Sequence, residues 1–348
     1  DLRDFRKLGA PRLYFGVNAG AMDSMVNHYT AAKRLRSDDA YTPEGKAGQR
    51  PDYAVTVYTK ILKEIYPDIP VIIGGIEASL RRVTHYDYWQ NALKPSILVD
   101  SGADWLCYGM GERTMIEFTK AIEAGRNIND IRKIPQLGFY MDGRCRTKDA
   151  VILNSYERCC KDKVAFAENF HVVETYANMQ NPPVLVEPVG NGYVQINPTW
   201  PPATQEEMDS FWDLPYTKLP HPRYKGKHIP AFEMIKFSVN THRGCFGGCN
   251  FCTIAAHQGK FIQSRSEESI LKEIAALNRL PGFAGNISDV GAPTANMYGM
   301  RGKNPELCLK CRRKSCLFPG PCKNMDRSHE RLLKLYERIA KVKGIRHA

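Results

Sequence analysis

The sequence places three cysteines within eight residues, in the segment CFGGCNFC. Cys245, Cys249 and Cys252 are spaced C-x3-C-x2-C, and Gly247 and Gly248 lie in the first gap. Three thiols cannot all pair with one another as disulfides, whereas cysteines at short spacing are typical metal ligands. Glycine has no side chain, so a glycine-rich backbone can wrap closely around a bound group. The segment therefore predicts a loop built around a metal.

Two kinds of metal site suit three cysteines on one loop. A structural zinc ion takes four ligands, and His242 or His257 would supply the fourth. An iron–sulfur cluster is held by cysteine thiolates, and three of them would leave one iron open. An open metal position distinguishes a reactive site from a structural one. The glycines favour the cluster, because a lone zinc ion needs no such flexible backbone.

A second group of cysteines follows in the segment CLKCRRKSCLFPGPC, spaced C-x2-C-x4-C-x5-C. Four cysteines form a complete tetrahedral set, so they predict a second metal site for zinc or for an auxiliary iron–sulfur cluster. The alternative is four buried or free thiols. Basic residues in the same stretch would offset thiolate charge or contact phosphate. The cysteines are Cys308, Cys311, Cys316 and Cys322, and the basic residues are Lys310, Arg312, Arg313 and Lys314.

Composition narrows the class of protein. No apolar run approaches the roughly 18 residues that span a bilayer, and the opening DLRDFRKLGAPRLYFG is too polar for a signal peptide. We therefore expect a cytoplasmic protein with no membrane partner. The chain carries 49 Lys and Arg against 37 Asp and Glu, a net charge of +12. This excess favours anionic partners such as RNA or a nucleotide, although a generally basic surface would explain it equally well.

The N-terminal part of the chain alternates predicted strands with predicted helices. Strands are expected in Pro11–Val17, Ile69–Gly75 and Ala103–Gly109, and helices over residues 54–66 and 112–125. This order predicts a doubly wound α/β domain over residues 1–156.

Ligands of such domains bind at the carboxyl ends of the strands. Two segments, Gly74–Arg82 and Tyr108–Arg113, follow predicted strands and carry glycines and arginines that would admit an anion. The alternative is a pair of tight turns without a ligand.

The remaining chain is predicted to form a connector and a second domain. Prolines accumulate in residues 157–230, which indicates a connecting segment. In residues 231–348 we expect a strand at Ile235–Val239, then the cysteine loop, a helix capped by Ser264 and Glu267, and a second strand before residue 294. This order suits the first unit of a TIM-like barrel, in which active-site loops follow strands. A final amphipathic helix is expected in residues 328–344.

The C-x3-C-x2-C spacing, with an aromatic residue directly before the third cysteine, resembles the signature of radical SAM enzymes. The resemblance implies that Cys245, Cys249 and Cys252 hold a 4Fe–4S cluster. It implies that the open iron binds S-adenosylmethionine, that the reduced cluster cleaves it to a deoxyadenosyl radical, and that Phe251 lies against the adenine.

Further site residues are implied by the same resemblance. A Gly-Gly-Glu-like turn receives the methionine amine in this family, and the matching residues here are Gly291, Ala292 and Pro293. The acidic residue is missing, so backbone carbonyls would bind the amine. Arg265 would reach the carboxylate of S-adenosylmethionine, or else it has a surface role at the start of a helix.

Three segments together resemble the YgiQ-type radical SAM proteins: HRGCFGGCNFCTIAAHQGKFIQSRSEESILKEI, IIGGIEASLRR and DVGAPTANMYGM. Members of that family are longer, so the chain is expected to be an N-terminal portion that ends within a partial (β/α) barrel. The N-terminal domain is similar to the cobalamin-binding domains that precede some radical SAM barrels. The Asp-x-His-x-x-Gly motif that ligates cobalt is absent from this sequence.

We therefore predict a radical SAM enzyme that uses a 4Fe–4S cluster, S-adenosylmethionine and a reductant such as flavodoxin or ferredoxin. Its substrate is unknown, with RNA or a nucleotide as the expected class. The first alternative is a non-catalytic nucleic-acid-binding protein with structural zinc or iron–sulfur sites. The second is an electron-transfer iron–sulfur protein, which would need a fourth cysteine near Cys252, and the sequence has none close by.

Overall fold

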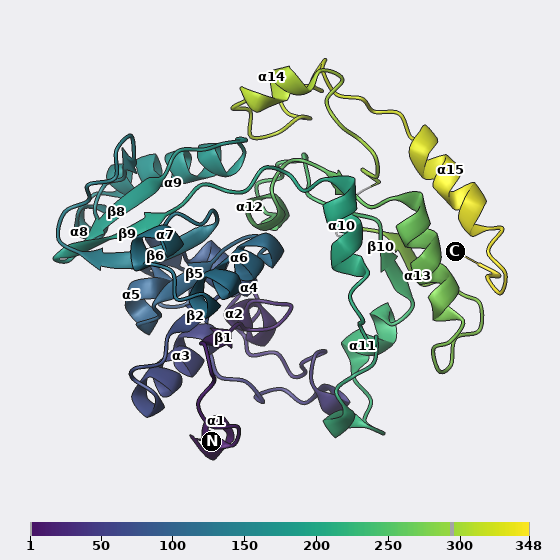
Figure 1. Ribbon diagram of the computed structural model, residues 1–348, viewed down its shortest axis with the longest axis horizontal. Helices are drawn as coiled ribbons and strands as arrows, with labels where there is room; N and C mark the ends of the chain where they lie inside the picture. Colours follow the sequence, from purple (N-terminus) through teal and green to yellow (C-terminus); the bar gives the residue numbers. More distant parts are fainter. Residues whose placement is uncertain (1, 293–295, 348) are drawn as a thin grey trace. The chain divides into compact units, whose positions relative to one another are not determined.

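The computed structural model describes residues 2–292 and 296–347, and the chain divides into two compact units (Figure 1). The first unit comprises Asp1–Arg36 and Arg50–Trp200, and the second comprises Ser37–Gln49 and Pro201–Ala348. In the described part of the chain, every helix is too short or too polar to cross a membrane.

A seven-stranded sheet organises the first unit. Its strand order is β1-β2-β5-β6-β9-β8-β7. The first three strands run parallel, β5, β6, β9 and β8 pair antiparallel in turn, and β7 returns parallel to β8. The strands are β1 (Phe15–Val17), β2 (Val71–Ile73), β5 (Trp105–Cys107), β6 (Leu137–Asp142), β7 (Val151–Ile152), β8 (Leu185–Val189) and β9 (Gly192–Ile196).

Helices cover both faces of the parallel part of the sheet. Because side chains alternate along a strand, Val71 and Ile73 pack into one core while Ile72 packs into another. The first core includes residues of α3 (Ala54–Ile65) and α5 (Ile97–Ser101), and the second includes residues of α6 (Glu112–Glu123) and α7 (Ile128–Ile131). The predicted doubly wound α/β class is confirmed, although each of the three strands is shorter than predicted.

The remaining elements of the first unit are short helices, one 15-residue helix and one hairpin. The helices are α1 (Leu2–Arg6), α2 (Ser24–His28), α4 (Gly75–Leu80), α8 (Tyr156–Lys161) and α9 (Lys163–Ala177), and the hairpin joins β3 (His85–Asp87) to β4 (Ala92–Lys94).

The segment predicted as a connector, residues 157–230, is divided differently in the structure. Its first part supplies α9, β8 and β9, and β9 lies inside the sheet between β6 and β8. All five residues of β9 are buried. The prediction of a connector was based on prolines, which are rare inside strands. Pro188 nevertheless lies within β8, which pairs antiparallel with β9. Only the part after Trp200 belongs to the second unit.

The second unit also takes in a segment from far earlier in the chain. Residues 37–49 contain the short 3₁₀ helix η1 (Pro43–Gly45). Glu44 N–H donates to the His228 carbonyl at 2.6 Å, and the Ala231 N–H donates to the Ala40 carbonyl at 2.8 Å. This segment therefore packs beside α11 (Pro230–Ile235), which follows η2 (Pro222–Tyr224) in the chain.

The centre of the second unit is one strand–loop–helix–strand unit. Strand β10 (Ser238–Asn240) pairs in parallel with β13 (Asp289–Gly291), and α13 (Glu267–Leu277) connects them. The predicted order of strand, cysteine loop, helix and strand is thus confirmed. The helix starts later than predicted, because Ser266 is its N-cap and accepts the Ser269 N–H at 3.0 Å.

Helix α15 (Glu330–Ile339), the predicted amphipathic helix, completes this core. Its buried Leu332, Leu335 and Ile339 pack with Val239 of β10 and with α13 and β13. The other elements of the unit are α10 (Gln205–Trp212), β11 (His242–Arg243), α12 (Ile254–Gln258), β12 (Gln263–Ser264) and α14 (Pro305–Leu309).

Candidate functional site

The cysteine loop leaves the sheet directly after β10 and is closed at its base by a short ladder. Strand β11 pairs antiparallel with β12, so that His242 faces Ser264 and Arg243 faces Gln263. One step inside this ladder, the Cys245 N–H donates to the Gly259 carbonyl at 3.0 Å. The loop therefore begins and ends at one place, beside the carboxyl end of β10.

Two glycines allow the backbone of this loop to fold as it does. Gly244 has a φ of +91°, and a Cβ there would collide with the Phe261 carbonyl. Gly248 has a φ of +65°, and a Cβ there would lie 2.7 Å from the Cβ of Ser315. Both positions combine a left-handed backbone with a close neighbour, so both require glycine.

Gly247 has a different role, because sulfur atoms surround it. A Cβ on Gly247 would lie 3.4 Å from the Cys245 Sγ and 3.6 Å from the Cys249 Sγ. The Gly247 N–H also donates to the Cys245 Sγ at 3.4 Å. The Cys252 N–H donates to the Cys249 carbonyl at 3.1 Å, so these two cysteines form a turn. The backbone thus leaves a space without side chains beside the thiols of Cys245 and Cys249. The third thiol, that of Cys252, lies one turn further along the loop.

The three thiols are close enough to influence one another. Burial raises the pKa of the Cys245 thiol, the Gly247 N–H lowers it, and Cys252 and Cys249 each raise it. Across the described residues, no three His, Cys, Asp or Glu side chains converge tightly enough to hold a single metal ion. In an iron–sulfur cluster each cysteine binds a different iron, so its sulfurs need not converge on one point.

The outer side of the loop is exposed. Phe251, predicted to lie against adenine, is 91% exposed, and Cys249 is exposed as well. An exposed aromatic ring beside the third cysteine is available for stacking with a ligand.

The residues predicted to bind the methionine amine lie at the end of β13. The Gly291 carbonyl accepts two hydrogen bonds from Thr241, from its N–H at 2.7 Å and from its hydroxyl at 3.1 Å. Because a carbonyl oxygen has two lone pairs, this one is already saturated. Ala292 is half-buried and follows directly. Pro293 lies outside the described residues.

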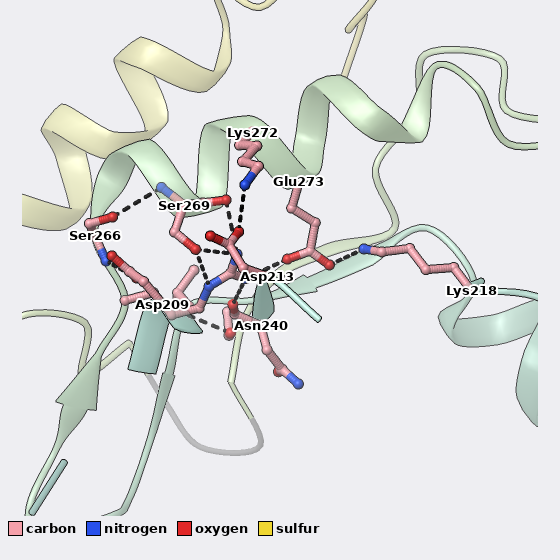
Figure 2. Close-up of polar contacts among 11 residues, drawn as sticks. Asp209, Asp213, Lys218, Asn240, Ser266, Ser269, Lys272 and Glu273 are labelled. Carbon is pink, nitrogen blue, oxygen red and sulfur yellow. Dashed lines mark hydrogen bonds and ion pairs between the residues drawn. The ribbon is translucent and has the colours of Figure 1, made fainter. Parts of the chain in front are cut away.

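Arg265 is not placed to bind a ligand carboxylate. Its guanidinium is 1% exposed and donates to the Asn240 carbonyl at 2.7 Å and to the Ser269 carbonyl and hydroxyl, both at 2.9 Å from Nη2. It also forms an ion pair with Glu273, which in turn contacts Lys218 (Figure 2). These contacts occupy its donors, so the structure gives Arg265 the task of joining β10 to α13.

His242, one of the two histidines considered as a zinc ligand, is buried at the base of the loop. Its Nδ1 lies 2.9 Å from the Thr241 hydroxyl, and burial lowers its pKa to about 4. It is therefore neutral at physiological pH. His257 lies on α12, further along the loop.

The second group of cysteines lies on a loop that packs directly on the first. The Cys316 N–H donates to the Phe246 carbonyl at 3.0 Å, and the Ser315 hydroxyl donates to the Gly247 carbonyl at 2.6 Å. Phe246, Cys245, Cys316 and Cys322 share one small apolar cluster. Sequence reasoning missed this contact, since nothing in a single sequence pairs residues about 70 positions apart.

Sequence reasoning also missed Lys260, which is only 2% exposed and lies against the second group of cysteines. The only signal available was a lysine between Gly259 and the apolar pair Phe261 and Ile262. That signal is too weak to predict burial, because lysine is almost always exposed.

A separate cavity of about 360 Å³ lies in the first unit, at the carboxyl ends of β1, β2 and β5. Gly74 and Gly75 line it from one predicted ligand segment, and Gly109 and Gly111 line it from the other. The predicted arginines do not line it. Arg81 pairs with Asp23, and Arg82 lies over the ring of Tyr108 and donates to the Ser79 carbonyl. The cavity is thus lined mainly by glycines and apolar side chains, without a cation.

Comparison with known proteins shows the family to which the chain belongs. Residues 1–238 match the family described as radical SAM N-terminal, and the chain belongs to this family. The match ends shortly before the cysteine loop.

Its relatives are UPF0313 proteins, which include YgiQ, as the sequence predicted. The chain is 52% identical to a UPF0313 protein of Bacteroides thetaiotaomicron, over 99% of this chain and 58% of the relative. It is 43% identical to the UPF0313 protein YgiQ of Escherichia coli K12, over 99% of this chain and 54% of the relative. The chain thus spans about half the length of the curated relatives it matches.

A weaker similarity links the chain to a solved structure of the radical S-adenosylmethionine methyltransferase TsrM from Kitasatospora setae. The TM-score is 0.41 at 16% identity, over 80% of this chain and 36% of that one.

Proposed function

We propose that this chain carries the cluster-binding part of a radical SAM enzyme, with Cys245, Cys249 and Cys252 as ligands of a 4Fe–4S cluster that binds S-adenosylmethionine. The observation that carries the proposal is the loop itself. Three thiols stand on one closed loop after β10, and a side-chain-free Gly247 separates two of them. Membership of the radical SAM N-terminal family supports the same assignment.

A cluster held by Cys245, Cys249 and Cys252 would, once reduced, supply the one electron that cleaves the sulfonium of S-adenosylmethionine into methionine and a deoxyadenosyl radical. The chain's own residues hold and orient the reactants. Gly247 N–H donates to the Cys245 sulfur, which stabilises a thiolate. Phe251 offers an exposed ring to the adenine. Arg265 and Thr241 fix the ends of β10 and β13, so the two strand ends that flank the loop stay in register.

The methionine amine needs an acceptor other than the Gly291 carbonyl, because Thr241 already saturates that oxygen. We assign this task to the Ala292 carbonyl, the next residue along the same strand end. The electron would come from a flavodoxin or a ferredoxin. RNA or a nucleotide is the proposed substrate class, supported by the net charge of +12 alone.

Electron paramagnetic resonance on anaerobically reconstituted, reduced protein tests the proposal. We expect a reduced-cluster signal whose shape changes when S-adenosylmethionine is added. The part of the signal that responds to S-adenosylmethionine should disappear in the C245A/C249A/C252A variant. The C145A/C160A variant is the matched control, because these cysteines belong to the first unit, and it should keep the signal.

Two results would overturn the proposal. A cluster signal that ignores S-adenosylmethionine would indicate an electron carrier. Zinc without iron, measured by elemental analysis of the same samples, would indicate a structural metal site in a nucleic-acid-binding protein.

A further inference from the structure

We infer that Cys308, Cys311, Cys316 and Cys322 bind a second metal centre through four thiolates, and that this centre holds the first cysteine loop in place. The inference goes beyond the proposed function, because it rests on residues of the second loop. It would stand even if the first loop bound no cluster.

The four thiols gather in one region of the second unit. Cys316 interacts electrostatically with each of the other three thiols. The chain turns so as to bring them together: the Cys311 N–H donates to the Cys308 carbonyl at 3.2 Å, and the Cys322 N–H donates to the Cys316 carbonyl at 2.7 Å. The first of these turns repeats the one between Cys249 and Cys252 in the other loop. In both loops a C-x2-C pair is therefore held in a tight turn.

A buried lysine, Lys260, lies against these thiols. Its ammonium is buried, and it donates to the Arg313 carbonyl at 2.6 Å and contacts the Cys311 Sγ at 3.6 Å. In the described part of the chain, none of the ion pairs formed by carboxylates includes Lys260. A buried ammonium is costly unless a negative charge compensates it. Cysteine binds a metal as the thiolate, so a metal-bound Cys311 would place such a charge beside Lys260.

A second donor points to the same conclusion. The side-chain amide of Asn324 donates to the Cys308 Sγ at 3.4 Å. Gly302 keeps this region clear, because a Cβ there would overlap the same sulfur. Hydrogen bonds to a ligating sulfur are typical of the surroundings of metal–thiolate sites, which they help to orient.

Four thiolates need a cation in addition to Lys260. Together they carry a charge of −4, and one lysine leaves most of it uncompensated. A metal centre supplies the rest, and four cysteines are the complete ligand set of a structural zinc site or of an iron–sulfur cluster. As the structure stands, no three of the described thiols converge on one point. Rotation about the Cα–Cβ bond moves each sulfur between staggered positions, so binding requires the thiols to turn inward.

The link to the first loop runs through Ser315, which is buried. Its hydroxyl donates to the Gly247 carbonyl and accepts the N–H groups of Leu317 and Phe318, both at 3.0 Å. Ser315 stands next to Cys316 and against Gly248. A metal bound by Cys316 would thus restrain Gly247 and Gly248, the residues between the first two ligands of the other site.

Metal content tests the inference directly. The C245S/C249S/C252S variant lacks the first site, so any metal that it retains belongs to the second. We expect about one zinc or about four irons per chain by inductively coupled plasma mass spectrometry, which also distinguishes the two metals. Adding C311S and C316S to this variant should lower the content at least tenfold. Adding C145S and C160S instead should not change it.

The C311S/C316S variant measures how the loss of the second centre affects the first loop, because the iron that this variant retains belongs to the first site. We expect it to hold about two irons per chain or fewer, half of the roughly four of a fully loaded first site. The S315A variant should lose iron from the first site and keep the metal of the second site. Circular dichroism verifies that each variant is folded. Full iron loading of the first site without the second centre would overturn the coupling.

The two proposals fail separately. If the C245S/C249S/C252S variant holds no stoichiometric metal while the parent protein gives a cluster signal that responds to S-adenosylmethionine, the second centre is wrong and the proposed function stands. If that variant keeps its metal while the parent protein gives no such response, the second centre stands alone.

Discussion

Arg265 and Glu273 form an ion pair inside the second unit, between the end of the cysteine loop and the middle of α13 (Figure 2). The guanidinium also donates to the Asn240 carbonyl, at the last residue of β10. One side chain therefore connects the strand that precedes the cysteine loop with the helix that follows it. The geometry of the loop depends on this connection, although Arg265 contacts none of the three cysteines.

Replacing Arg265 should destabilise the second unit strongly. In R265A the Glu273 carboxylate loses its buried partner and keeps only Lys218, so the cost should lie near the lower end of the roughly 3–5 kcal/mol typical of a broken buried pair. Urea denaturation of the protein measures the change. The R338A variant is the matched control. Arg338 pairs with Glu267 and Glu268 of α13 at the surface, so its removal should change the free energy of unfolding little. Equal stability of R265A and R338A would contradict the structural role given to Arg265.

The space beside Gly247 should be needed for the cluster and not for folding. In G247A the new methyl group would lie in ordinary contact with the sulfurs of Cys245 and Cys249, so the fold tolerates it. The same methyl group would occupy the space between two cluster ligands. We expect iron content after reconstitution to fall several-fold, with an unchanged melting temperature. G320A, in the second cysteine loop, is the control, because a Cβ there meets nothing within 4 Å.

Phe251 should contribute to binding S-adenosylmethionine without contributing to stability. It is 91% exposed, so F251A removes almost no buried area. Stacking of a base on an aromatic side chain contributes about 1–3 kcal/mol, so affinity should fall at least about fivefold. Isothermal titration of the reconstituted protein measures this affinity. F318A removes a similarly exposed ring, at 76%, from the second loop and should leave the affinity unchanged.

Glu187 should make the first unit less stable at high pH than at low pH. It is buried in β8, where the Thr84 N–H donates to its Oε2 at 2.8 Å, and burial raises its pKa to about 7. The unfolded chain releases the Glu187 proton near pH 4.5, whereas the folded protein keeps it up to about pH 7. The free energy of unfolding therefore falls as the pH rises from about 4.5 to about 7.

The E187Q variant removes this penalty. It should unfold at higher urea than the parent protein at pH 8, by about 3 kcal/mol at most, with the difference vanishing near pH 4.5. E157Q should not be stabilised at pH 8, because the Gly190 N–H donates to that carboxylate and the surroundings of Glu157 lower its pKa. An E187Q difference that is constant across pH would refute the assignment.

The strand–helix alternation of the first unit and the β10–α13–β13 order of the second could be predicted from the sequence. Both depend on local patterns, namely continuous apolar runs for buried parallel strands and a period of 3.6 for helices. The place of β8 and β9 could not be predicted in this way. Their pairing joins β6 to strands about 50 residues later, and prolines in the same segment favoured a connector.

For the candidate site, the sequence by itself determined the ligand chemistry: three thiols at C-x3-C-x2-C spacing, with glycines between them and an aromatic residue before the last. Only the tertiary structure decided what surrounds these residues. It turned Arg265 inward, saturated the Gly291 carbonyl with Thr241, and brought Ser315 and Lys260 to the two cysteine loops. The physical reason is that ligand type depends on the side chain alone. Burial, hydrogen-bond partners and charge compensation depend on residues that are distant in sequence, and only folding brings those together.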